Sequence, residues 1–394
     1  MLKSPLDGLT VVSLEQAVAA PFATRQLADL GARVIKIERP GVGDFARSYD
    51  DVVKGLSSHF VWLNRSKESL TLNLKRQEGV DVLRKLLFKA DIFVQNLAPG
   101  ATARMGLTGD LLRAEHPRLI VCNLSGYGTT GPYRNRKAYD LLVQAESGLI
   151  SITGTAENPA KVGVSVADIA AGMYAYSGVL TALYTREQTG KGLVIEVSMF
   201  EALGEWLGFP LHYTMHRGTA PSRSGARHAT IAPYGPFSSA DGEVVYLGVQ
   251  NEREWSRFCC EVLKSDVLSS DSRFQSNTRR IENSVVLDRE IEDVFSILSG
   301  SEIVRRLNGA SIANARLNSI EQFLNHEQLR SRSRWQEVDS SVGPLRSLIP
   351  PVNMEGVVPR MDRIPDLGEH TDCILGELSY DLETVAKWRA NGIV

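Results

Sequence analysis

The sequence lacks the cysteine spacing of a metal site or a disulfide framework. Its four cysteines are Cys122, Cys259, Cys260 and Cys373, and none of them forms a CxxC motif. Zinc and thioredoxin-type sites are therefore excluded, because both need that spacing. Adjacent residues such as Cys259 and Cys260 make a poor metal clip or disulfide. We expect reduced thiols, no metal and a cytoplasmic protein.

Long apolar runs and an excess of one charge are also missing. The N-terminal stretch MLKSPLDGLTVVSLEQ has no apolar segment after Lys3, so it does not predict a secretory signal. The longest mostly apolar stretch, residues 170–184, is shorter than the ~20 residues of a membrane span, and we expect a buried helix there. The 44 Lys and Arg residues nearly balance 46 Asp and Glu. We therefore expect a soluble protein with no nucleic-acid or membrane partner.

Nucleotide-binding motifs do not fit either. The chain has no GxxxxGK[ST], which excludes a Walker-type ATPase. A single GxGxxG match, residues 126–131, follows a predicted strand, but Pro132 comes next and no helix pattern begins there. The dinucleotide fingerprint needs that helix. The turn after the first predicted strand, SLEQAVAAPF, contains no glycine. The sequence does not favour a nicotinamide or flavin cofactor.

Strand and helix patterns alternate over the first ~200 residues, a length typical of one α/β domain. Strands are predicted at residues 8–14, 32–38, 69–74, 91–96 and 119–125, with helices at 22–29 and 78–90. A strand, a helix and a strand in close succession form a βαβ unit, which implies a parallel sheet. We predict an α/β fold whose large, Rossmann-like domain with a parallel sheet starts with residues 1–205.

The amino-acid composition changes from about residue 222. Gly, Pro, Ser and Arg crowd residues 222–237, which predicts a loop. A strand at 242–249 and amphipathic helical segments after it indicate a smaller α+β domain over residues 222–329. Residues 330–394 contain two Pro-rich connectors and a final helical pattern. We predict that this segment returns to the large domain.

Asp168 lies in the segment VSVADIAAGMYA, directly before a predicted helix of small residues. One interpretation is a helix N-cap, because Asp accepts hydrogen bonds from unpaired backbone N–H groups and suits the positive end of the helix dipole. The other is an ionised nucleophile held at the helix start, where Gly172 would let a ligand approach. The spacing leaves both interpretations open.

Five ordered blocks resemble family III CoA transferases, a group that includes the formyl-CoA and carnitine enzymes and the α-methylacyl-CoA racemases. The blocks are residues 27–41, 63–75, 96–107, 166–175 and 367–378. The resemblance implies a CoA-transferase with acyl-CoA and a small carboxylic acid as substrates. It implies no cofactor beyond the coenzyme A thioester, and an interlocked homodimer in which each chain threads through the other.

The resemblance also implies residue roles. Asp168 matches the nucleophile, and Gln16 matches a glutamine that faces the reacting carboxylate. The positions that match the CoA site are Arg39, Leu72, Lys75, Asn96, Leu97, Arg104, Met105 and Lys137. The cations among them would meet phosphates, and Leu72 and Met105 would contact the adenine. The Asp168 carboxylate would pass through an acyl anhydride and a CoA thioester, with oxyanion donors from backbone N–H groups at the helix start and a loop containing Gly225.

Residues 14–26 and 43–50 look most like transferases for small branched dicarboxylic acids of the mesaconate, itaconate and citramalate type. A second carboxylate on the acyl group would need a cation. The candidate substrate residues are Arg47, Tyr139, Gly225, Arg227 and His228, with Arg223 as a further cation.

Three alternatives stay open. A racemase of this family uses a His–Asp pair for proton transfer; here Tyr139 precedes Asp140 at that position, which favours the transferase. The chain could also be a non-catalytic acyl-CoA-binding relative, although Asp168 and Gln16 argue against it. An intramolecular CoA shift within one dicarboxylate would use the same nucleophile as transfer between two acids.

Overall fold

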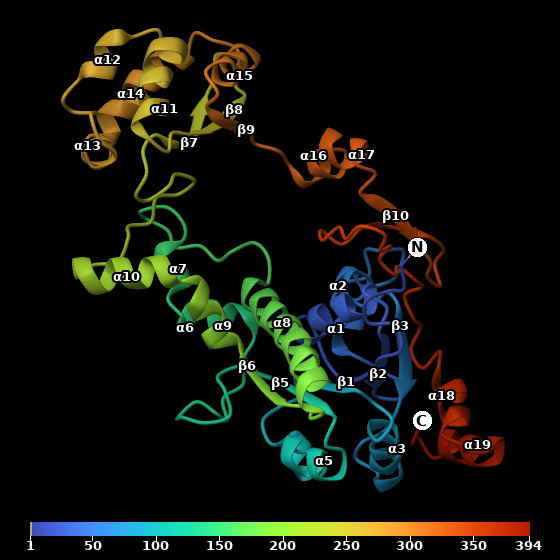
Figure 1. Cartoon of the computed structure of the whole chain (residues 1–394). Helices are drawn as coiled ribbons and strands as arrows, with labels where there is room; N and C mark the ends of the chain where they lie inside the picture. The colour runs from blue at the N-terminus through green and yellow to red at the C-terminus, as the bar shows by residue number, and fades with distance from the viewer. Residues whose placement is uncertain (1) are drawn as a thin grey trace. The chain divides into compact units, whose positions relative to one another are not determined.

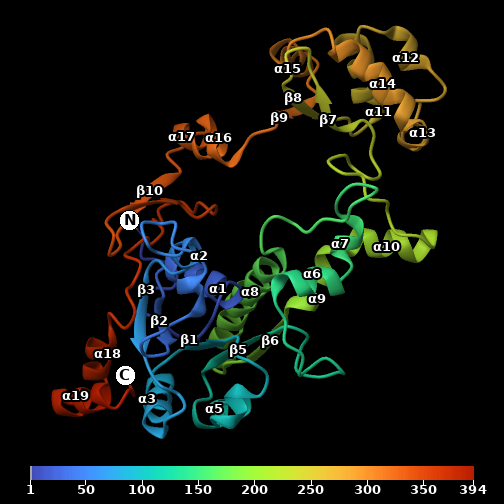
Figure 2. The same cartoon turned by 180° about the vertical axis from the view of Figure 1, so that it is seen from behind.

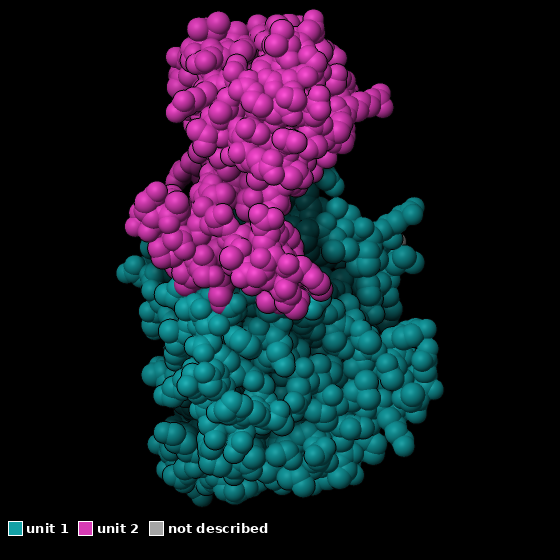
Figure 3. Space-filling view, turned by 90° about the vertical axis from the view of Figure 1, so that its left-hand side faces the viewer, with its two compact units in different colours: residues 1–147, 163–207, 329–394 teal, residues 148–162, 208–328 magenta. Residues whose placement is uncertain are grey.

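The computed structural model describes residues 2–394, which form two compact units (Figure 3). Of the described residues, the first unit comprises 2–147, 163–207 and 329–394, and the second comprises 148–162 and 208–328. Each unit has a hydrophobic core of its own. The candidate residues therefore fall into two groups, one in each unit.

A six-stranded parallel sheet forms the centre of the first unit, in the order β3-β2-β1-β4-β5-β6. Its strands are β1 (Thr10–Leu14), β2 (Arg33–Glu38), β3 (Lys67–Thr71), β4 (Ile92–Gln95), β5 (Ile120–Ser125) and β6 (Val194–Ser198). Val12 of β1 lies opposite Ile35 on one side and Phe93 on the other. The prediction of an α/β fold with a parallel sheet is confirmed.

One face of this sheet packs on helices from both ends of the chain. The core on this face contains Val12, Ile35 and Phe93 from the strands. It also contains residues of α3 (Gln77–Leu87), α5 (Gly109–Glu115), α18 (Thr371–Glu377) and α19 (Leu382–Ala390). Strands buried on both faces need apolar residues at nearly every position, which explains the continuous apolar runs in β1 and β5. The C-terminal helices thus complete the core of the first unit.

The other face is covered by α1 (Ala19–Asp29) and α8 (Val166–Thr189), which lie side by side in Figures 1 and 2. Gly172 lies at their contact, because a Cβ there would be 2.7 Å from the carbonyl oxygen of Ala19 and 3.0 Å from Cδ1 of Phe22. The prediction that Gly172 lets a ligand approach is therefore wrong. Its missing side chain lets two helices meet.

At 24 residues, α8 extends beyond the predicted 170–184 at both ends. Its length and composition would suffice to cross a membrane, and 44% of its apolar window is buried inside the structure. The core helix of a soluble protein has the same two properties, so these features alone do not indicate a span. Its packing against α1 and the sheet is that of a core helix.

Short elements complete the first unit. They are η1 (Phe45–Ser48), α2 (Ser58–Leu63), α4 (Ala101–Arg104), α6 (Asp140–Glu146), α9 (Met199–Trp206) and an antiparallel pair of strands, β10 (Trp335–Val338) and β11 (Leu345–Leu348). Of these, η1, α2 and α6 position side chains of the candidate site.

The second unit is built on a three-stranded antiparallel sheet, β7 (Tyr234–Ser238), β8 (Val244–Gly248) and β9 (Ala313–Arg316). The predicted strand at 242–249 corresponds to β8. The loop predicted for residues 222–237 is wrong at its end, because β7 begins at Tyr234 and pairs with β8. Gly235 and Pro236 are rare in strands, so the local sequence does not indicate one here. The pairing with β8 determines the extended conformation.

Helices pack on this sheet around a core that includes Trp255, Phe258 and Phe295. They are α11 (Glu252–Arg257), η2 (Phe258–Leu263), α12 (Asp266–Ser270), α13 (Asn277–Glu282), α14 (Ser284–Phe295) and α15 (Gly300–Gly309). Outside this core, the unit also contains α7 (Leu149–Ile152), α10 (Gly208–Arg217), α16 (Ile320–Leu324) and α17 (Glu327–Ser331), which crosses the boundary to the first unit.

Candidate active site

The carboxyl ends of four neighbouring strands bring most of the first-unit candidates to one edge of the sheet. Gln16 follows β1, Arg39 follows β2, Leu72 and Lys75 follow β3, and Asn96 follows β4. Because the strands are parallel, these segments share an edge (Figure 1). The strand order also changes direction at β1, between β2 and β4. In open α/β sheets, ligands bind at such a switch point, outside the carboxyl ends of the strands.

Gln16 is fixed by its neighbour Asn96. The Gln16 N–H donates to Asn96 Oδ1 and Asn96 Nδ2 donates to the Gln16 carbonyl, both at 2.9 Å. The side-chain Oε1 of Gln16 accepts from the Phe45 N–H at 3.3 Å. The amide of Asn96 thus holds the backbone at Gln16. The resemblance implies a different contact for Asn96, with coenzyme A.

Asp168 lies in the first turn of α8, after the helix start. The helix begins at Val166, and its N-cap residue is Ser165. The N-cap interpretation of Asp168 is therefore wrong: Asp140 Oδ1 instead accepts from the unpaired N–H of Ala167, at 2.8 Å. Because α8 connects β5 to the parallel strand β6, it runs back across the sheet and starts at the carboxyl edge. This places Asp168 at the same edge as Gln16.

The Asp168 carboxylate accepts no hydrogen bond from any donor among residues 2–394. Burial, and secondarily the negative charge of Asp140, raises the pKa of Asp168 to about 7. Such a group is available as a nucleophile or a base near neutral pH.

Tyr49 is a site residue that the sequence interpretation missed. Burial raises the pKa of its hydroxyl to about 12, and the charges of Asp44 and Asp168 and the Tyr139 hydroxyl contribute to this rise. The Tyr49 ring packs edge-on against His59, with centroids 5.2 Å apart. Tyr49 therefore lies in the electrostatic field of Asp168. Its place in the segment GDFARSYD is the signal that could have identified Tyr49, because this segment also contains the candidate Arg47.

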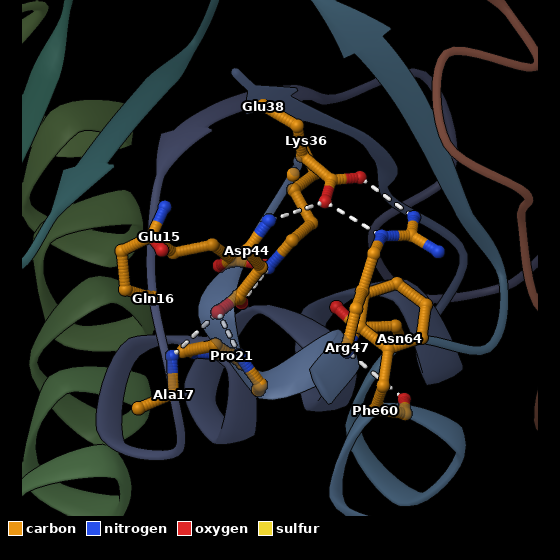
Figure 4. Close-up of polar contacts among 12 residues, drawn as sticks. Glu15, Gln16, Ala17, Pro21, Lys36, Glu38, Asp44, Arg47, Phe60 and Asn64 are labelled. Atoms are coloured by element: carbon orange, nitrogen blue, oxygen red, sulfur yellow. Dashed lines mark hydrogen bonds and ion pairs between the residues drawn. The ribbon is translucent and has the colours of Figure 1, made fainter. Parts of the chain in front are cut away.

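A buried network of charges lies beneath the Gln16 turn (Figure 4). Lys36 Nζ contacts Asp44 at 2.8 Å and Glu15 at 3.3 Å, and Lys67 Nζ contacts Glu15 at 2.7 Å. All four side chains are fully buried. Burial would raise the pKa of Glu15, but Lys67 and Lys36 outweigh it and hold the pKa at about 2. Burial lowers the pKa of Lys67 to about 8, against the attraction of Glu15.

Arg47 belongs to this network through Glu38. Its Nε and Nη2 donate to the two oxygens of Glu38 at 2.8 Å each, and its guanidinium lies 3.7 Å from the ring centroid of Phe60. Burial would raise the pKa of Glu38, but Arg47 and Lys36 hold it at about 2. A paired, stacked guanidinium has a structural role in η1. Its predicted contact with a substrate carboxylate stays a prediction.

The remaining first-unit candidates differ in exposure. Arg39, Lys75, Arg104 and Lys137 are exposed, and none of these four has an acidic partner among residues 2–394. Leu97 and Met105 are partly buried against the core, and Tyr139 is exposed at the start of α6. Leu72 is only 1% exposed and belongs to the core, so its side chain offers no open surface to an adenine. Exposed cations without an acidic partner suit the phosphates of a ligand.

The two candidate arginines of the second unit are bonded to other residues of that unit. Arg223 donates to three backbone carbonyls, those of Ser151, Thr155 and Ala156. Arg227 pairs with Asp288 at 3.1 Å.

Gly225 and His228 are the other two predicted substrate residues of this loop. Gly225 has a φ of 61°, and its N–H donates to the carbonyl of Gly154 at 2.8 Å. The His228 ring is stacked on Tyr234, with centroids 5.3 Å apart. Their roles toward a substrate stay predictions, as do those of Arg223 and Arg227.

Comparisons with known proteins cover nearly the whole chain. The model of a family described as CoA-transferase family III matches residues 6–371. The succinyl-CoA:glutarate CoA-transferase of Homo sapiens is 32% identical over 396 residues, covering 99% of this chain and 90% of that protein. The acetyl-CoA:oxalate CoA-transferase of Acetobacter aceti is 36% identical over 333 residues, covering 84% and 85%.

A solved structure agrees with these relatives. The crystal structure of a CAIB/BAIF family protein from Brucella suis has a TM-score of 0.82 and 31% identity, and the match covers 96% of this chain and 100% of that one. The likeness in sequence and in fold therefore extends over both units.

Proposed function

We propose that this chain, which belongs to CoA-transferase family III, transfers coenzyme A between small dicarboxylic acids through covalent intermediates on Asp168. Family membership makes the chain a CoA-transferase, which uses acyl-CoA thioesters and carboxylic acids as substrates. Two relatives are named for glutarate and oxalate, and both acids are dicarboxylic. The observation that carries the mechanism is the unbonded carboxylate of Asp168, held in the first turn of α8 at the carboxyl edge of the sheet.

The reaction begins when an Asp168 oxygen attacks the thioester carbonyl of the donor. The carbon–sulfur bond breaks, giving an acyl-aspartyl anhydride and the thiolate of coenzyme A. The thiolate then attacks the aspartyl carbonyl, releasing the first acid as a carboxylate and leaving an aspartyl-CoA thioester. The acceptor carboxylate attacks this thioester, which breaks its carbon–sulfur bond, expels the thiolate and forms a second acyl-aspartyl anhydride. The thiolate then attacks the acyl carbonyl of that anhydride. This last step forms the product thioester and regenerates the Asp168 carboxylate, with no net hydrolysis.

The environment of Asp168 supports this role. A pKa of about 7 keeps a substantial ionised fraction at neutral pH and leaves the carboxylate a better nucleophile than a fully solvated one. Desolvation also protects an anhydride from water. Three N–H groups of the first turn of α8 already donate within the protein: Val166 to Val164, Ala167 to Asp140 and Ile169 to Ser165. The N–H of Asp168 has no such acceptor among residues 2–394, and we assign it to the oxyanion of the tetrahedral intermediates.

Exposed cations at the same edge support coenzyme A binding. Arg39, Lys75 and Arg104 follow three different strands, and none has an acidic partner among residues 2–394. We assign them to the phosphates of coenzyme A. Met105, partly buried beside Arg104, is assigned to the adenine, and Leu72 is not. Changing each cation to Ala should raise the KM for acyl-CoA without lowering kcat.

The acyl group is proposed to be a branched dicarboxylic acid of the mesaconate, itaconate or citramalate type, from the resemblance of residues 14–26 and 43–50. Its second carboxylate would meet Arg47 or Arg227. An increase in the KM for the dicarboxylate in Arg47→Ala or Arg227→Ala, with a monocarboxylate as control, would support this assignment. An unchanged KM in both variants would contradict it.

The mechanism is tested by trapping the intermediates. The protein is incubated with succinyl-CoA or itaconyl-CoA, quenched with hydroxylamine or borohydride, digested and analysed by mass spectrometry. We expect a modification confined to the Asp168 peptide and absent from Asp168→Ala. Asp140→Asn is the matched control, because it changes the neighbouring carboxylate and leaves the nucleophile in place. No adduct with either substrate, together with deuterium exchange at the substrate α-carbon, would indicate racemase chemistry instead.

A further inference from the structure

The carboxamide of Gln16 has its orientation set by a backbone group. Its side-chain oxygen accepts from the N–H of Phe45 at 3.3 Å. A backbone N–H only donates, so the atom that faces it must be the carbonyl oxygen, and the NH₂ group must point the other way. Among residues 2–394, no acceptor bonds to that NH₂ group. Gln16 therefore presents a free hydrogen-bond donor at the carboxyl edge of the sheet.

Asp44 ties together the two backbone segments that hold Gln16. Its Oδ1 accepts from the N–H of Ala17 at 3.1 Å and from the N–H of Ala46 at 2.9 Å. Ala17 has a φ of 61°, in the left-handed region. This conformation is strained for an alanine and persists only where its surroundings restrain it. Asp44 supplies that restraint, and it also caps η1, whose first N–H is the one that contacts Gln16.

A buried cation is paired with Asp44. Lys36 Nζ lies 2.8 Å from Asp44 Oδ2, and both side chains are fully buried. Lys36 in turn reaches Glu15, which is held by Lys67 and by the hydroxyl of Thr24 at 2.6 Å. The network therefore extends from the strand core to the Gln16 turn.

We infer that Asp44 and the backbone N–H of Phe45 act as a positioning device for Gln16, which directs its NH₂ group at the carboxylate that reacts with Asp168. This inference rests on the proposed function, because it concerns the same acid and the same nucleophile. A donor at that point binds an oxygen of the acid and stabilises the negative charge that develops there during attack. Asp44 and Phe45 touch no substrate; they act through Gln16.

Changing Phe45 to proline removes the one backbone N–H that donates to the Gln16 side chain. Asp44 has φ −68° and ψ 133°, an extended conformation that is allowed before proline, and Phe45 is the first residue of η1, where proline is tolerated. Phe45→Ala removes the same ring but keeps the N–H, so it sets the baseline. We expect Phe45→Pro to have a kcat about 10- to 100-fold below that of Phe45→Ala, with the same KM for acyl-CoA. Equal kcat values in the two variants would overturn the inference.

A double-mutant cycle gives an independent test through the side chain of Asp44. Asp44→Ala, which removes the acceptor of the Ala17 and Ala46 N–H groups, is measured in the wild-type background and in Gln16→Ala, at equal folded fractions determined by near-UV circular dichroism. If Asp44 acts through Gln16, its substitution lowers kcat in the first background and has no further effect in the second. The same fold-loss in both backgrounds would show a purely structural role. Asp29→Ala is the matched control, because it breaks another buried pair, with Arg65 at 2.8 Å.

Failure of this inference is distinct from failure of the proposed function. If Asp168→Ala keeps its activity and forms the same adducts, covalent catalysis by Asp168 is wrong, whatever the Phe45 variants do. If Asp168→Ala is inactive while Phe45→Pro and Phe45→Ala turn over equally, only the positioning of Gln16 is wrong.

Discussion

Asp140 Oδ1 accepts a hydrogen bond from the backbone N–H of Ala167 at 2.8 Å, which joins the start of α6 to the first turn of α8. The same Asp140 side chain accepts from Gln144 at 2.7 Å through its other oxygen. The contact restrains Asp168, the next residue along α8. It also brings a second carboxylate close to Asp168, and this charge adds to burial in raising the pKa of Asp168. One side chain therefore restrains the position of the proposed nucleophile and adds to the effect of burial on its pKa.

Removing the charge of Asp140 should change the pH profile of the enzyme. In Asp140→Asn, the amide oxygen still accepts from Ala167, but the repulsion that disfavours ionisation of Asp168 is lost. The pKa of Asp168 then falls, and the acid limb of kcat/KM against pH moves to lower pH. Glu146→Gln, at the far end of α6, is the control and should leave the limb in place. An unmoved limb in Asp140→Asn would show that burial alone sets the pKa.

Neutralising Asp168 should stabilise the fold at alkaline pH. Because the folded-state pKa of Asp168, about 7, lies above its ordinary value of 3.8, folding favours the protonated form. Its contribution to stability is complete below pH ~4 and is lost as the pH rises through ~7. Asp168→Asn should therefore raise the Tm at pH 8 and change it little at pH 4.5, measured by thermal unfolding. Asp110→Asn, an exposed aspartate in the first turn of α5, should show no such gain.

Breaking the buried charge network should cost a large part of the stability of the fold. Lys36→Met leaves Asp44 without its partner in a fully buried position and removes one of the two cations beside Glu15. The loss of one member of such a pair costs about 3–5 kcal/mol of unfolding free energy. Urea unfolding measures this change. Arg76→Met, which removes an exposed pair with Glu78, should leave the free energy of unfolding unchanged; a similar loss in both variants would contradict the special role of the network.

A methyl group at Gly172 should separate α1 from α8. Its Cβ would lie 2.7 Å from the Ala19 carbonyl oxygen, so the helices must shift, at a cost of about 1–3 kcal/mol. Gly204→Ala is the control, because that glycine lies in α9 with open space around its Cβ position. It should be neutral or stabilising by up to about 1 kcal/mol. Denaturant unfolding compares the two; equal effects would show that the helix contact tolerates a side chain.

Local patterns in the sequence determined the first five strands of the parallel sheet and the fold class. The run from Arg33 to Glu38 predicts a strand because its apolar residues, Val34, Ile35 and Ile37, are all β-branched. The family pattern located Asp168 by its place before a helix of small residues. It also brought Gln16, Arg39 and Asn96 into consideration, and the parallel strand order then places them at one edge.

Only the tertiary structure decided what the polar side chains contact. Lys36 and Lys67 are surface residues by composition, yet both are fully buried, because Glu15 and Asp44 come from other segments of the chain to meet them. Asp140 rather than Asp168 caps the start of α8, since its position depends on how α6 packs. Gly172 serves a helix contact instead of a ligand. These contacts join residues from different segments of the chain. The packing of strands and helices brings those segments together, and the local sequence pattern does not specify that packing.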